Sequence, residues 1–196
     1  YCVLSSIIII TLFSLMKIST ANAAALSAPH TQAALKIDGK LDEAAWQTAL
    51  VGTSFVYTQT SHQDHAPAPT EARFLVDDNA VYVGIRCTEP EMAKLQDAPL
   101  PRDSAIWSQD CVEVFLAPSG RQTSFYHFMV GASGAQFDQY MVENGKLEGP
   151  PYNAIWQSAV YKGADFWSAE LRIPLSAFPF TNSDQFSSTW LVNVTR

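Results

Sequence analysis

The stretch Ala72–Cys87, ARFLVDDNAVYVGIRC, decides the fold class. Apolar side chains alternate with other residues on both sides of a central Asp77-Asp78-Asn79 triplet. Alternation with a period of two is typical of a β-strand with one face in the core, and Asp and Asn favour tight turns. The stretch therefore predicts a β-hairpin, with one strand on either side of the triplet.

The same pattern recurs along most of the chain, with turns that carry Gly, Pro, Asn or Asp. Short strands are predicted at 53–58, 111–116, 124–130, 136–141, 156–161, 166–173 and 189–194. The segment LKIDGKLDEAAW (Leu35–Trp46) predicts a short strand, a turn at Asp38-Gly39 and a short helical turn over 41–49. About nine short strands with one or two short helical turns indicate an all-β, mostly antiparallel β-sandwich of the jelly-roll or immunoglobulin-like kind.

One domain accounts for most of the chain, because the sequence shows no internal repeat and no sign of a second domain. We expect this domain over 35–196, after a flexible lead-in over 24–34 that is rich in Ala, Ser and Pro. The last predicted strand runs to Arg196 without a closing turn. This ending indicates an incomplete C-terminus.

The first 23 residues are interpreted as a secretory signal peptide. The apolar run Ile7–Leu15 is shorter than the about 20 residues that a membrane-spanning helix needs. Ala21-Asn22-Ala23 has the small-x-small pattern of a cleavage site, although Lys17 follows the apolar run instead of preceding it. We expect export to the periplasm or the extracellular space, and an uncleaved membrane anchor is the alternative.

The formal net charge of the 196-residue chain is −7. An acidic chain without a cluster of Lys or Arg is a poor candidate for binding nucleic acid or anionic membranes, whereas neutral sugars are compatible with it. Cys87 and Cys111 both fall in predicted strands. An oxidising compartment would permit a disulfide between them, and two buried thiols are equally compatible with the sequence.

The stretch DSAIWSQDCVEVFLAP (Asp103–Pro118) carries the first candidate site residues. Trp107 precedes a strand, where its ring either stacks on a sugar or packs into the core. Glu113 lies on the opposite strand face from Val112 and Val114, a face that is either exposed or part of a groove. Asp110 is assigned a structural role in the turn.

His127 and Met129 share one face of the next predicted strand, where a histidine is more often structural than a ligand. Asp110 and Glu113 are three residues apart on a strand and point to opposite faces, so they make a poor catalytic pair. The chain contains no GxSxG, HExxH or P-loop motif. Acidic clusters at Asp77-Asp78 and at Asp38, Asp42 and Glu43 could bind calcium, although turn formation explains them better. No catalytic residue is assigned.

Three segments in this order resemble the family 9 carbohydrate-binding modules. They are IDGKLDEAAW (37–46), PTEARFLVDDNAVYVGIRCTEPE (69–91) and WSQDCVEVFLAP (107–118), the last with a W-x-x-D-x-V-E-V-F pattern. The resemblance implies a lectin-like sandwich that holds the end of a sugar chain between two tryptophan walls. It places one wall at Trp107, a hydrogen-bonding acid at Glu113 and a rim residue at His127, where sugar-binding members carry an arginine. It gives no position for the second wall, and it implies structural calcium without assigning the ligands.

The leading hypothesis is an exported, non-catalytic domain that binds ends of oligosaccharides or polysaccharides such as xylan or cellulose and supports their degradation. One alternative is a haem b electron-transfer domain, because related sandwiches bind haem and His127 with Met129 or Met141 could supply axial ligands. Another is an accessory domain of a glycoside hydrolase whose catalytic domain, which hydrolyses O-glycosyl bonds, lies outside this chain. A structural or adhesive domain without a small ligand is the fourth.

Overall fold

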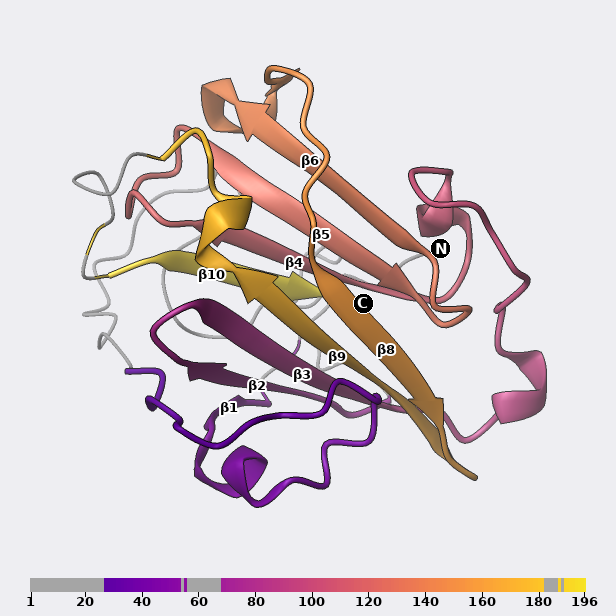
Figure 1. Ribbon diagram of the computed structural model, residues 1–196. Helices are drawn as coiled ribbons and strands as arrows, with labels where there is room; N and C mark the ends of the chain where they lie inside the picture. Colours follow the sequence, from indigo (N-terminus) through magenta and orange to yellow (C-terminus); the bar gives the residue numbers. More distant parts are fainter. Residues whose placement is uncertain (1–26, 54, 56–67, 182–186, 188) are drawn as a thin grey trace.

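The computed structural model describes residues 27–53, 55, 68–181, 187 and 189–196. Within these residues, ten strands form two five-stranded sheets that pack as a β-sandwich, as the alternating pattern predicts (Figure 1). The remaining regular elements are short 3-10 helices. In the described part of the chain, no helix is long and apolar enough to cross a membrane. The predicted signal peptide at 1–23 lies outside the described residues.

Both sheets are antiparallel throughout. The first sheet has the order β1-β2-β3-β9-β8 and the second has the order β10-β4-β5-β6-β7. The strands of the first sheet are β1 (Leu50–Gly52), β2 (Thr70–Val76), β3 (Ala80–Thr88), β8 (Gln157–Lys162) and β9 (Phe166–Pro174). The strands of the second are β4 (Cys111–Ala117), β5 (Phe125–Gly131), β6 (Gln136–Val142), β7 (Leu147–Glu148) and β10 (Leu191–Thr195).

The predicted hairpin is confirmed as β2 and β3, which pair from Thr70 opposite Cys87 to Val76 opposite Val81. Its turn is held by Asp77, whose Oδ1 accepts the backbone N–H groups of residues 79 and 80, each at 2.7 Å. An aspartate that accepts backbone donors two and three residues on is a common means of closing a tight turn. Asp77, the first residue of the acidic pair at 77–78, therefore has a structural role in the turn.

The main core lies between the two sheets and is built from the inward faces of their strands. Its buried members include Val83, Ile85, Val112, Val114, Leu116, Phe128, Trp156, Trp167, Leu171 and Ile173. Burying a side chain of this size contributes about 1.5–3 kcal/mol relative to leaving it exposed. Trp156 and Trp167 are fully or almost fully buried in this core, and Trp190 packs against it while partly exposed.

The two cysteines belong to different clusters. Cys87 is buried in the main core, and Cys111 is buried on the opposite side of the second sheet with Ile106 and Met129. They are separate thiols and not a disulfide. Burial raises the pKa of the Cys87 thiol to about 12, so this group stays protonated and unreactive near neutral pH.

Three segments differ from the predicted strands. The short strand expected at the start of Leu35–Trp46 is absent, because this segment lies across the face of the first sheet and not along an edge where it could pair. The helical turn expected over 41–49 is the 3-10 helix η1 (Ala44–Thr48). The strand expected at 53–58 is preceded by β1, and residues 54 and 56–58 lie outside the described part. The two-residue strand β7 was not predicted.

The expected lead-in also makes ordered contacts with the domain. The backbone N–H of Thr31 donates to Val76 O at 2.8 Å, and Val76 N–H donates to Pro29 O at 3.1 Å. His30 forms an isolated parallel bridge with Val76. The described end of the lead-in is therefore attached to β2.

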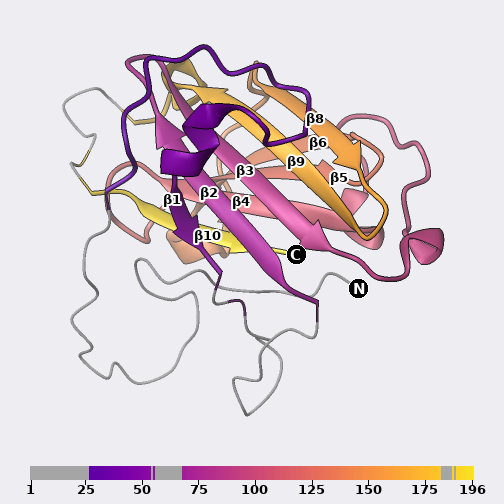
Figure 2. The same ribbon diagram turned by 90° about the horizontal axis from the view of Figure 1, so that it is seen from below.

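Residues 35–49, here called the N-terminal strap, cover the outer face of the first sheet. Figure 2 shows this segment and η1 lying across β2, β3 and β9. Trp46 is fully buried there with Leu75, Ala80 and Tyr82, in a cluster separate from the main core. Trp46 thus belongs to a second, smaller core outside the sandwich.

A buried carboxylate fastens the N-terminal strap to β9. Glu170 is fully buried and accepts three N–H groups, from Asp38 N at 2.8 Å, Gly39 N at 2.7 Å and Trp46 Nε1 at 2.9 Å. Gly39 has a φ of 86°, and a Cβ at this position would lie 2.5 Å from the backbone nitrogen of Tyr161. Only glycine fits both the backbone conformation and the close approach.

Glu170 also gives a prediction for the pH dependence of stability. Burial raises the pKa of Glu170 above the ordinary glutamate value, against the opposing effect of the three N–H donors. A raised folded-state pKa means that the stabilisation linked to this group is full below the pKa of the unfolded chain and is lost as pH rises through the folded-state pKa. We therefore expect the stability of the protein relative to Glu170→Gln to be greater at about pH 5 than at about pH 8.

Urea unfolding of both proteins at the two pH values measures this difference, because all other titrating groups are shared and cancel. A stability difference that grows toward alkaline pH would contradict the prediction.

Candidate functional site

The candidate site residues lie on the outer face of the second sheet, the face turned away from the main core. Strand pairing places two rows of side chains across this face. One row is Thr195, Glu113, Met129 and Phe137, and the next is Asn193, Phe115, His127 and Gln139, each in the strand order β10-β4-β5-β6. The predicted pair of Glu113 and His127 is therefore brought together from neighbouring strands.

Glu113 and His127 form a buried, close contact. His127 Nε2 lies 2.7 Å from Glu113 Oε2, although the ring N–H is not aimed along this contact as in a hydrogen bond. The residues are only 8 % and 5 % exposed. Glu113 is therefore mostly buried, with 11 % of its side chain still exposed, so this face is neither fully exposed nor a wide-open groove at this position.

The imidazole of His127 has two further neighbours, one at its second ring nitrogen, Nδ1, and one stacked on its ring face. Its Nδ1 lies 2.9 Å from Gln139 Nε2. The ring of Phe115 stacks on it with centroids 4.2 Å apart and planes at 13°. Three neighbours thus fix the imidazole, and the amide of Gln139 is a polar group on this face that the sequence interpretation did not single out.

Trp107 is the exposed aromatic group of this region. It lies in the 3-10 helix η3 (Ile106–Ser108), between β3 and β4, and is 51 % exposed. Its ring packs edge-on against Phe137, with centroids 5.6 Å apart and planes at 85°. The preceding residue, Ile106, is fully buried with Met129 beneath the loop. Of the two roles considered for Trp107, this position favours an open ring face over a core residue.

Asp110 makes the contacts of a structural turn residue. Its Oδ2 accepts the backbone N–H of Gln96 at 2.7 Å, and its own N–H donates to Gln96 O at 3.1 Å. Its backbone carbonyl accepts the N–H of Ala132 at 2.8 Å. Asp110 therefore ties the two ends of the loop that carries Trp107, and it connects that loop to the segment after β5.

Several buried polar atoms near these residues lack a hydrogen-bond partner within the described part of the chain. Two of them flank Glu113: Thr195 Oγ1, on the paired residue of β10, and Nε2 of His127. A third is Oε1 of Gln109, two residues after Trp107. Buried polar groups are normally paired, so these three atoms are exceptions among the described residues.

The predicted haem ligands do not form an axial pair in this arrangement. His127 and Met129 are two residues apart on β5 and project side by side, whereas axial ligands approach iron from opposite sides. Met141 lies one row further along β6, opposite Phe125. A Soret band in the absorption spectrum of the protein would support haem binding.

The acidic residues of the N-terminal strap approach one another as a calcium site would require. Carboxylate oxygens of Asp38, Asp42 and Glu43 lie within 4.8 Å of one another. The ammonium of Lys36 lies 2.8 Å from Asp38, and its backbone N–H donates to Glu43 at 3.2 Å. Lys36 thus pairs with one oxygen of Asp38 and one of Glu43, whereas Oε2 of Glu43 is buried without a hydrogen-bond partner among the described residues, so structural calcium at this cluster stays a prediction.

The fold is an antiparallel β-sandwich, and comparison with known proteins assigns the family. A model of the family described as "Carbohydrate family 9 binding domain-like" matches residues 37–190. The chain belongs to this family, and it is a carbohydrate-binding domain of that class. The matched region begins within the N-terminal strap and includes every predicted site residue.

Solved structures share the fold at low sequence identity. A family 9 carbohydrate-binding module from Caldicellulosiruptor kristjanssonii in complex with cellotriose is 18% identical, with a TM-score of 0.55 over 86% of this chain and 81% of that one. The same module with glucose gives 18% identity and a TM-score of 0.55 over 85% and 83%. A putative carbohydrate-binding protein from Bacteroides uniformis is 14% identical, with a TM-score of 0.65 over 86% and 81%. No curated protein sequence matches this chain.

Proposed function

We propose that this protein is an exported, non-catalytic domain that binds the end of an oligosaccharide or polysaccharide chain on the outer face of its second sheet. The observation that carries the proposal is the half-exposed ring of Trp107 beside a buried polar cluster on a domain of this family. The domain would support the degradation of the polysaccharide by keeping associated enzymes near it. The solved family module with cellotriose or glucose makes glucose-based sugars the first ligands to test.

Trp107 supplies a flat apolar surface on which one face of a pyranose ring stacks. A sugar ring presents C–H groups on its faces and hydroxyls at its rim, so a tryptophan beside polar side chains matches both parts. The edge-on contact with Phe137 supports the tryptophan ring from below. Stacking of this kind provides contact area without requiring any chemical step.

Glu113 and His127 supply the polar part of the site. Glu113 uses Oε2 in its contact with His127, and 11 % of its side chain stays exposed, through which its other oxygen would accept a sugar hydroxyl. Hydrogen bonds to a charged carboxylate are stronger than those between neutral groups. Because a sugar gives up water at every hydroxyl and the contact area is small, we expect weak binding overall.

Replacing Trp107 with alanine tests this proposal. We expect Trp107→Ala to weaken binding of cellobiose, xylobiose or glucose by at least about tenfold, because truncating an aromatic anchor commonly costs more than 1 kcal/mol. Isothermal titration measures the affinity, and circular dichroism verifies that the variant is folded. Tyr161→Ala is the matched control, since Tyr161 is another partly exposed aromatic residue, on β8 of the other sheet.

Equal affinity for the parent protein and Trp107→Ala would contradict the stacking role. Absence of binding to any of these sugars by the folded parent protein would contradict the sugar-binding function itself.

A further inference from the structure

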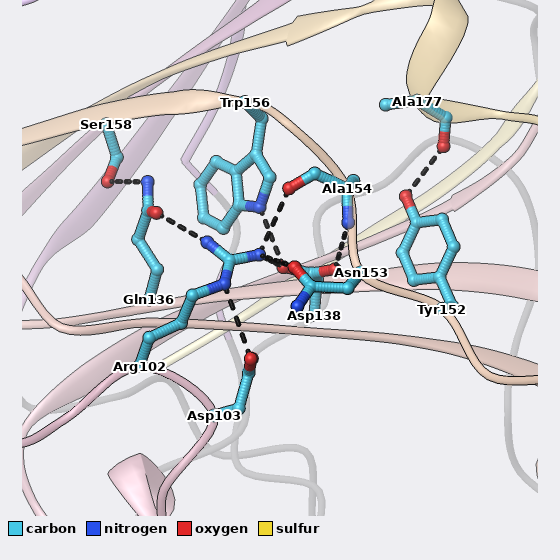
Figure 3. A network of polar contacts seen from close by, with 10 residues as sticks. All are labelled: Arg102, Asp103, Gln136, Asp138, Tyr152, Asn153, Ala154, Trp156, Ser158 and Ala177. Carbon is cyan, nitrogen blue, oxygen red and sulfur yellow. Dashed lines mark hydrogen bonds and ion pairs between the residues drawn. The ribbon is translucent and has the colours of Figure 1, made fainter.

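Arg102 lies at the centre of a polar network that joins the Trp107 loop to two other segments (Figure 3). Its guanidinium donates to Gln136 Oε1 at 2.7 Å, to Asn153 Oδ1 at 3.0 Å and to Ala154 O at 3.1 Å. It also forms an ion pair and hydrogen bond with Asp138. The rigid fork of an arginine can hold several acceptors at fixed directions, which a lysine cannot do.

Asp138 is the buried partner that gives this network a fixed position. Its side chain is completely buried on the inner face of β6. Besides Arg102, it accepts the indole N–H of Trp156 at 2.9 Å and the backbone N–H of Ala154 at 2.7 Å. A carboxylate held by three donors in the core is an immobile anchor for the guanidinium that reaches it.

The chain between Arg102 and Trp107 is a compact unit, so the position of one residue determines that of the other. Asp103 has a φ of 60°, a left-handed conformation that Asp tolerates, and its N–H donates to Gln136 O at 2.9 Å. Ser104 Oγ donates to the carbonyl of residue 101 at 2.7 Å, and Ile106 N–H donates to Ser104 O at 2.7 Å. These short-range bonds leave little freedom between the guanidinium and the indole.

We propose that Arg102 is a positioning residue for sugar binding, which holds the ring of Trp107 in place above the outer face of the second sheet. This inference rests on the proposed function of Trp107 and adds the residue that sets its geometry. Arg102 does not contact the sugar. It acts by fixing the loop to the buried Asp138, so that the stacking surface is formed before the ligand arrives.

Three variants separate a positioning role from a general contribution to stability. Arg102→Met removes the guanidinium, and Arg102→Lys keeps the positive charge without the planar, forked guanidinium group. Arg102→Met combined with Asp138→Asn removes the buried charge that Arg102→Met leaves without a cation, so part of the lost stability returns while the loop stays detached. Lys162→Met is the matched control, because the Lys162–Asp97 ion pair attaches the same loop through partly exposed side chains.

The first readout needs no sugar. The indole N–H signal of Trp107 in an NMR spectrum is assigned with Trp107→Phe, and hydrogen exchange is measured over residues 103–109. We expect this signal to shift or broaden, and exchange to accelerate, in Arg102→Met and in the double variant, while the indole signal of the buried Trp167 stays unchanged. Lys162→Met should leave both readouts at the parent values.

The second readout is sugar affinity by titration. We expect about tenfold weaker binding in Arg102→Met and in the double variant, and partial recovery in Arg102→Lys. An unchanged Trp107 signal in Arg102→Met, or affinity that recovers with stability in the double variant, would overturn the positioning role. If the parent protein binds no sugar, the proposed function fails while the indole signal still decides whether Arg102 positions Trp107.

Discussion

Glu170→Ala is expected to lower the free energy of unfolding by about 4 kcal/mol, because it leaves two buried N–H donors and one partly buried N–H donor without an acceptor. The donors come from the turn at 38–39 and from the indole of Trp46, so the loss also loosens the N-terminal strap from the first sheet. For a domain of this size the melting temperature should fall by about 10 °C. Urea unfolding and thermal denaturation followed by circular dichroism measure both quantities.

Glu71→Ala is the control for this experiment. Glu71 pairs with Arg73 on β2 through a partly exposed side chain, and such pairs contribute about 1 kcal/mol or less. If Glu170→Ala costs no more than Glu71→Ala, the strap is not fastened by Glu170 and its burial is held by apolar contacts alone.

Asp138→Ala is expected to lower the free energy of unfolding by about 3 kcal/mol. The substitution leaves the indole N–H of Trp156 and the backbone N–H of Ala154 buried without their acceptor. Arg102 is partly exposed and can regain water, so its share of the loss is smaller. Chemical denaturation measures the change.

The matched control is Asp97→Ala, which removes the acid of the ion pair between Asp97 and Lys162. Both partners are partly exposed, and we expect a loss below about 1 kcal/mol. A loss in Asp138→Ala as small as that in the control would show that the segment at 153–156 is held by packing and not by this carboxylate.

The strands could be predicted from the sequence because their information is local. The alternation in Ala72–Cys87 and in the strands of the second sheet depends only on which residues face the core, and β4, β5 and β6 begin and end within about a residue of the prediction. The strap was predicted less well. Its hydrogen bond to Glu170 joins residues 131 apart in the sequence, Gly39 and Glu170, and no periodicity reveals a partner at that distance.

The candidate site could be predicted only in part, for the same reason. The pattern placed Glu113 and His127 each on one face of its strand, and the strand order then brought them to 2.7 Å. The neighbours that enclose them come from pairings that the sequence does not specify, such as Thr195 on β10 opposite Glu113. Arg102 was missed because a single arginine in a loop carries no signal of the buried aspartate that it meets.

Because the strap covers the outer face of the first sheet, the two outer faces of the sandwich differ from each other. The strap and its cluster around Trp46 lie on the outer side of the first sheet, and Trp107 stands over the outer side of the second. A domain seated on a polysaccharide surface through Trp107 would turn the strap toward bulk solvent. A fluorophore on an exposed strap residue such as Gln47 would therefore report attachment to insoluble fibres without blocking it, and the strap is the side from which to tether the protein to a sensor chip.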